Sequence, residues 1–191
     1  MASEIIVNTI KAPTTGANAN KVIIPSGVTL DASAGTLKPS AGQIIKQESK
    51  VIETQVSSSS STPTSLVSSG FFMNYTPIDA TSLILVELFY HYYKSGSSTG
   101  GGLQLRKDGA NMSDLAPTST SGTWHTYDAN AQTTGHSQVN MAQEIAGNTN
   151  QRQYQCYISN YSGSTGTFYV GYNTSTSNMA RTFMRVTEIA Q

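Results

Sequence analysis

The sequence predicts an all-β protein whose main part is an antiparallel β-sandwich. After about residue 46, short runs rich in β-branched and aromatic residues recur at near-regular spacing, separated by turns of Gly, Ser and Asn. Few stretches between these runs have the periodicity of a helix. Charged residues make up only 12% of the chain while Ser and Thr are abundant, which favours a hydroxyl-rich β protein over a helical one.

The segment Leu83–Tyr93 is the predicted central strand, because it is the longest apolar and aromatic run. At a period of two, one face carries Ile84, Val86, Leu88, Tyr90 and Tyr92, and the other carries Leu83, Leu85, Glu87, Phe89, His91 and Tyr93. A strand with one solvated face alternates cleanly between apolar and polar residues, and this strand does not. Its second face is therefore expected to meet a second sheet or a neighbouring subunit. We predict a strand near an oligomer axis, with subunit contacts through Leu85, Phe89, His91 and Tyr93.

The remaining elements are short strands joined by turns. Strands are expected, in chain order, over Gln43–Val56 (one strand or two), Val67–Tyr75, Leu103–Lys107, Trp124–Tyr127, Gln153–Ser159, Thr167–Tyr172 and Arg181–Ala190. Val139–Ile145 fits either a strand or one helical turn. Loops or turns are expected at the serine run 57–61, at the Gly-rich stretch 95–102 and at Asp108-Gly109, a dipeptide typical of hairpins.

Residues 1–45 are predicted to form an extended N-terminal arm or short β stalk, and residues 46–191 the head. Apolar residues in the stretch 22–37 occur singly, between Pro-Ser-Gly and Ala-Gly turns. Such residues cannot build a core within one chain, but several copies wound around an axis can. A disordered leader is the alternative.

Charge and cysteine content exclude several functional classes. Eleven Lys and Arg balance eleven Asp and Glu, so there is no electrostatic case for nucleic acid or an anionic membrane surface. The N-terminus lacks the features of a signal peptide, and no apolar run approaches the roughly 20 residues that span a bilayer. We expect a soluble protein without membrane insertion. Cys156, the single cysteine, cannot form an intrachain disulfide and is expected in the core.

No catalytic residue, cofactor or metal site is predicted. His91, His125 and His136 do not form a recognisable metal signature. A small carbohydrate-active enzyme remains as an alternative, and Asp128 and Glu144 are its candidate carboxylates. These would have to lie about 5–10 Å apart, a spacing that the sequence does not reveal.

A binding surface is predicted at Trp124, His125 and Tyr127. These aromatic residues lie in a polar stretch of Thr, Ser, Gly and Asn. Aromatic rings beside hydroxyl and amide groups provide what a carbohydrate ligand needs, namely stacking on a sugar face and hydrogen bonds to its hydroxyls. The alternative is that Trp124 is a core or interface residue.

Two parts of the chain carry a family resemblance. Residues 22–37, VIIPSGVTLDASAGTL, resemble the IPSG-x-TLD-x-S-x-GTL segment of tail-fibre-like and appendage proteins of bacteriophages. The stretches LILVELFYHYYK, GGGLQLRKDGAN and RTFMRVTEIAQ are similar to the jelly-roll domain that follows this segment in such proteins. That domain looks like the trimeric jelly rolls of the tumour-necrosis-factor and complement type.

The resemblance implies a homotrimeric virion protein, made in the host cytoplasm. Its arm, with Ile5, Ile6, Val7 and Ile10, would attach to other virion proteins of the tail or capsid, and its head would face the host and bind a surface glycan. Because the long repetitive shaft of full-length fibres is lacking, a short tail fibre, a fibre tip and a head decoration stay open. The alternative function is a capsid decoration or cement protein that clamps capsid subunits. No catalytic residue is carried over.

Overall fold

The computed structural model describes residues 15, 39–95, 99–112, 126–128, 136–160, 166–171 and 181–191. The chain divides into two compact units, Met1–Lys38 and Pro39–Gln191, and the elements below belong to the second. The predicted anchoring residues Ile5, Ile6, Val7 and Ile10 lie outside the described residues.

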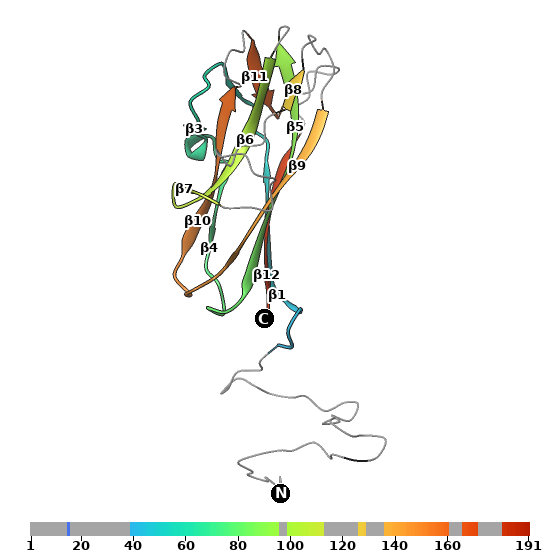
Figure 1. Cartoon of the computed structure of the whole chain (residues 1–191), viewed down its shortest axis with the longest axis vertical. Helices are drawn as coiled ribbons and strands as arrows, with labels where there is room; N and C mark the ends of the chain where they lie inside the picture. The colour runs from blue at the N-terminus through green and yellow to red at the C-terminus, as the bar shows by residue number, and fades with distance from the viewer. Residues whose placement is uncertain are drawn as a thin grey trace, which may run out of the picture. The chain divides into compact units, whose positions relative to one another are not determined.

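Pro39–Gln191 folds as two antiparallel sheets that face each other (Figure 1). The first sheet contains β1 (Ile44–Ile52), β2 (Val56–Ser58), β5 (Leu83–Ser95), β9 (His136–Ile145), β11 (Thr167–Val170) and β12 (Thr182–Ile189). The second contains β3 (Thr64–Ser65), β4 (Phe72–Tyr75), β6 (Thr99–Lys107), β7 (Ala110–Asn111), β8 (Thr126–Asp128) and β10 (Arg152–Asn160). Their strand orders, β1-β12-β5-β9 and β4-β10-β6-β8, are those of a jelly roll. The predicted all-β antiparallel sandwich is confirmed.

Strand β5 is central in the first sheet, as predicted. It pairs with β9 along one edge, and with β12 and then β11 along the other. Its inward face is fully buried at Ile84, Val86, Leu88 and Tyr90. Because side chains alternate across a strand, burying this face determines which residues the opposite face presents.

The core lies between the sheets and is built from alternate residues of the facing strands. Strand β10 contributes Tyr154, Cys156 and Ile158, and β11 contributes Phe168 and Val170, all fully or almost fully buried. The prediction that Cys156 is a small core residue is confirmed, and burial raises the pKa of its thiol. Val139–Ile145 lies within β9, so of the two predicted alternatives the strand is correct and the helical turn is not.

The Gly-rich stretch 95–102 was expected to be a turn, and this prediction is wrong for its second part. Gly100, Gly101 and Gly102 lie inside β6, where they pair with β8 and β10. A Cβ atom at Gly101 would lie 2.4 Å from Cγ of Phe168, so this position has room only for glycine. Glycine here serves close packing between the sheets.

Two other local predictions need correction, and one holds. Val67–Tyr75 is not a single strand, since a 3-10 helix, η1 (Val67–Ser69), ends at Gly70 with φ 86° before β4 begins. The serine run 57–61 is a loop only in part, because β2 extends to Ser58 by pairing with β11. At Asp108-Gly109 the φ angles of 50° and 83° form the predicted hairpin turn between β6 and β7.

A buried carboxylate holds the loop between β4 and β5. Glu188 of β12 accepts hydrogen bonds from the Tyr75 hydroxyl at 2.9 Å and from the backbone N–H groups of Ile78 and Asp79 at 2.9 and 3.0 Å. Burial raises the pKa of Glu188, but these hydrogen bonds outweigh it and the net pKa is lowered. The loop is therefore tied to the sandwich by an ionised side chain.

Replacing Gly101 by alanine tests the close approach of the two sheets. We expect Gly101→Ala to destabilise the fold by about 1–3 kcal/mol, the usual cost of overpacking a filled core. In a Phe168→Ala background this added cost should be smaller but not absent, because the ring at 2.4 Å is gone while Cβ of residue 168 would still lie 2.6 Å from the new Cβ. Chemical denaturation of the four proteins in this double-mutant cycle measures the coupling. Equal costs in both backgrounds would contradict this account.

Candidate functional site

The outward face of the first sheet gathers most of the exposed apolar side chains, and is here called the apolar face. In the described part of the chain, seven large apolar residues are exposed, and six of them lie on this face. They are Ile44, Val51, Phe89, Val139, Met141 and Ile145. Single exposed apolar residues need no explanation, but here six lie on three strands of one sheet, β1, β5 and β9, and large exposed apolar patches are typical of interaction surfaces.

Strand pairing arranges these residues in rows that cross the sheet. One row runs from Val139 on β9 through Phe89 and Phe183 to Val51 on β1. A second row, at the end of the sheet where β5 begins, consists of Ile145, Leu83, Ile189 and Ile44. At the other end, the rings of Tyr93 and Tyr169 lie 5.8 Å apart. The apolar face thus spans β9, β5, β12 and β1, with a tyrosine pair on β5 and β11.

An ion pair lies between the two apolar rows. Arg185 on β12 donates its Nε–H to Glu87 on β5 at 2.6 Å, and the two residues are direct cross-strand neighbours. Both charges are thus neutralised within one chain. A partner that covers the apolar face would leave no charge of this pair uncompensated.

The four residues predicted to contact other subunits all lie on the apolar face. Phe89 is exposed, and Leu85, His91 and Tyr93 are half-buried. The His91 ring meets Phe89 edge-on at 5.2 Å, and its Nδ1 lies 2.8 Å from the hydroxyl of Ser137. Sequence reasoning missed their neighbours on β9, β12 and β1, namely Val139, Phe183 and Val51. Alternation within each strand hints at these residues, but only the strand order brings them to one face.

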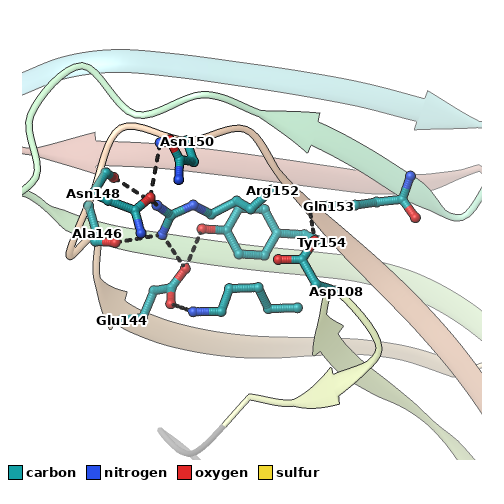
Figure 2. Close-up of polar contacts among 9 residues, drawn as sticks. Asp108, Glu144, Ala146, Asn148, Asn150, Arg152, Gln153 and Tyr154 are labelled. Atoms are coloured by element: carbon teal, nitrogen blue, oxygen red, sulfur yellow. Dashed lines mark hydrogen bonds and ion pairs between the residues drawn. The ribbon is translucent and has the colours of Figure 1, made fainter.

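A charged cluster closes one side of the sandwich, where β9 faces β10 and β6 (Figure 2). Arg152 Nη1 donates to Glu144 Oε1 at 3.0 Å, and the Tyr154 hydroxyl donates to the same oxygen at 2.7 Å. Lys107 pairs with the other oxygen, Oε2. Arg152 is 5% exposed and also donates to the carbonyls of Ala146 and Asn148. Its guanidinium therefore joins the β9–β10 turn to Glu144.

Glu144 is ionised in this setting. Burial raises its pKa, but hydrogen bonds from Lys107, Tyr154 and Arg152 outweigh burial, and the net pKa lies below the ordinary 4.5. Burial, followed by the hydrogen bond to Glu144, raises the pKa of the Tyr154 hydroxyl, which stays protonated. A carboxylate held in this way is a poor general acid, since a general acid needs a raised pKa.

The backbone pairing separates the two candidate residues of the enzyme alternative, Asp128 and Glu144. Asp128 pairs through its backbone with Thr99 at the start of β6, whereas Glu144 contacts Lys107 at the other end of that strand. Eight residues of extended chain separate these two points by about 26 Å. The pairing therefore puts the backbones of Asp128 and Glu144 toward opposite ends of β6, whereas two glycosidase carboxylates lie about 5–10 Å apart.

The predicted glycan-binding residues are only partly described. Trp124 and His125 lie outside the described residues. Tyr127 belongs to β8, and its backbone pairs with Gly100 of β6. Among the residues that the structure does describe, no group of three or more His, Cys, Asp or Glu is placed to hold a metal ion.

A search of the described residues for membrane spans found no helix with the length and apolar character to cross a bilayer.

No protein-family model and no curated protein matches this chain. Among solved structures it is similar to a chain of infectious bursal disease virus strain Gx, with 13% identity over 90% of this chain and a TM-score of 0.41. A mutant VP2 protein of the same virus, from derived T=1 particles, has 16% identity over 88% and a TM-score of 0.40. A chain of strain Gt has 17% identity over 88% and a TM-score of 0.36. Our chain covers 44%, 41% and 43% of these chains, less than half of each. With TM-scores below 0.5, this likeness identifies neither a family nor a function.

Removing the charge of Glu144 should destabilise the fold. We expect Glu144→Gln to cost about 3 kcal/mol at pH 7, near the low end of the range for breaking a buried ion pair, because Arg152 would keep its charge without a counterion. Glu53 provides a matched control, since it pairs with Arg181 at the surface, where the two side chains are 64% and 72% exposed. Glu53→Gln should change the free energy of unfolding by about 0.5 kcal/mol or less. Equal effects of the two substitutions would contradict the role of the cluster.

The same variant should also change the pH dependence of stability. The folded-state pKa of Glu144 is below 4.5, so the unfolded chain takes up this proton first as the pH falls. The stabilisation is complete above the unfolded pKa and is lost as the pH falls through the folded pKa. The stability difference between wild type and Glu144→Gln should therefore shrink below about pH 4.5. Denaturation curves at pH 7, 5, 4 and 3 measure it, and a difference that does not shrink would contradict the lowered pKa.

Proposed function

We propose that this chain is a structural protein of a bacteriophage virion, a short tail fibre or fibre-like appendage. It attaches through its N-terminal arm to other virion proteins, and its head is a homotrimer that binds the host surface, with a glycan as ligand. The resemblance of residues 22–37 to phage appendage proteins supports the virion setting. The apolar face of the head is the single observation that carries the proposed assembly.

Further copies of the same chain are the partners that best explain the apolar face. An exposed surface with Val139, Phe89 and Val51 in one row is costly in water and favours association. Homo-oligomers with closed symmetry are the most common way to cover such a surface. The arm favours the same partner, because its single apolar residues need several chains to form a core.

A capsid decoration or cement protein is the second candidate. In that case the apolar face would pack against a different protein rather than against other copies of this chain. The mass of the purified protein separates the two candidates, because a cement protein that uses this face for capsid subunits would be a monomer in solution.

A charge introduced into the apolar face should prevent trimer formation. We expect the wild type to have three times the chain mass of 20.3 kDa, and Phe89→Asp to have the mass of one chain. An aspartate at this central position would be buried without a partner in the trimer. Ile78→Asp is the matched control, because Ile78 is 59% exposed but lies in the β4–β5 loop, away from the apolar face. Light scattering measures the masses, and a monomeric wild type would refute the trimer.

Deletion of the arm should separate assembly of the head from attachment to the virion. The unit Pro39–Gln191 has its own core, so a chain without residues 1–38 is expected to fold and remain a trimer. It should no longer be incorporated into virions, because the proposed attachment residues, among them Ile5, Ile6 and Ile10, are removed. Mass spectrometry of purified virions measures incorporation. Normal incorporation of the shortened chain would refute attachment through the arm.

A further inference from the structure

A pocket of about 110 Å³ lies beside the charged cluster. It is formed where the β6–β7 hairpin approaches the end of β9, and Glu144 and Lys107 belong to both the cluster and the pocket. Its lining consists of Lys107, Ala110, Asn111, Met112, Gln143 and Glu144. Ala110, Asn111 and Gln143 are exposed, so the pocket is open to solvent, while Met112 is 9% exposed and provides an apolar wall.

The pocket has hydrogen-bonding groups of both kinds to offer a ligand. In the described part of the chain, the side-chain amide of Asn111 has no hydrogen-bond partner. Gln143 also lines the pocket, but it pairs with Leu85 and lies on the apolar face, so we do not assign it to the ligand. The Lys107 ammonium has three N–H groups and uses one for Glu144. The Glu144 carboxylate has about four acceptor positions, of which Lys107, Arg152 and Tyr154 occupy three. Hydrogen-bond donors and acceptors of the lining residues thus surround one small pocket.

This mixture is suited to hydroxyl groups more than to ions. A hydroxyl donates one hydrogen bond and accepts two, so it can use a carboxylate, an ammonium and an amide at the same time. An anionic ligand could use Lys107 and the Asn111 amide, but it would be repelled by Glu144 and would leave the free acceptor position of Glu144 unused. The apolar wall of Met112 and Ala110 is suited to the C–H face of a ring.

We propose that the pocket binds one neutral sugar residue of a host-surface glycan. Glu144 accepts from one ring hydroxyl, Lys107 donates to it or to its neighbour, and the amide of Asn111 orients the ring. The charged cluster holds Glu144 and Lys107 in place before the ligand arrives, which lowers the entropy cost of binding. This inference rests on the proposed function, because it names a ligand class and a location for its adhesive activity.

The test uses the full-length chain on an array of immobilised neutral and acidic oligosaccharides. We expect wild-type protein to bind neutral glycans, and Asn111→Ala to bind about three- to tenfold more weakly, the effect of losing one ordinary hydrogen bond. Gln151→Ala is the matched control, since Gln151 is an exposed amide outside the pocket lining, and its binding should equal that of the wild type.

The other outcomes overturn different parts of the proposal. If Asn111→Ala binds as tightly as the wild type while Trp124→Ala does not bind, the adhesive function stands and the pocket inference fails. Binding to acidic glycans alone would overturn the choice of a neutral sugar. If the wild type binds no glycan on the array, both the pocket inference and the adhesive half of the proposed function fail, whereas the trimer is still tested separately by mass.

Discussion

The double pairing of β5 is the constraint on which the rest of this structure depends. Strand β9 is hydrogen-bonded to one edge of β5, and β12 and β11 to the other, so the register of β5 is set from both sides. Its inward face, from Ile84 to Tyr92, fills the core. With a side-chain period of two, the opposite face must then present Leu83, Leu85, Phe89 and Tyr93 outward. The apolar face is therefore a direct consequence of the packing of the core, and the neighbouring strands extend it.

The two open sides of the sandwich are closed by charged side chains rather than by apolar ones. On one side, Lys46 and Lys50 of β1 lie over aromatic rings of β4 at 4.3 Å and donate to backbone carbonyls at 2.8 Å. On the other side, Glu144 of β9 meets Lys107 and Arg152 across the gap between the sheets. Long side chains can cover apolar atoms with their stems while their charged ends reach water or a partner. Among the described residues, the outward face of the first sheet is where most of the large exposed apolar side chains lie.

The sequence revealed those features that depend on local pattern. The central strand, its two faces, the buried Cys156 and the Asp108-Gly109 turn follow from alternation and turn chemistry, which act over a few residues. The role of Gly101 could not be read in this way, because the ring that excludes a side chain belongs to Phe168, on a strand far along the chain. The charged cluster was missed for a similar reason. Glu144 attracted attention as a catalytic candidate, but its partner Lys107 is brought close only by the pairing order of the sheets.

The apolar face and the charged cluster answer different physical needs, and this separates their functions. The cluster neutralises its carboxylate within one chain, and its ion pairs and hydrogen bonds link β9, β6 and β10 without any partner. The apolar face has no such internal cover in the described residues, although its ion pair between Glu87 and Arg185 is already satisfied. A surface with apolar rows across four strands gains by association through the apolar area it buries. The paired charges of Glu87 and Arg185 make their burial less costly than that of one unpaired charge. Our proposals therefore assign assembly to the face of the first sheet, and ligand recognition to the edge where polar groups keep free hydrogen-bonding positions.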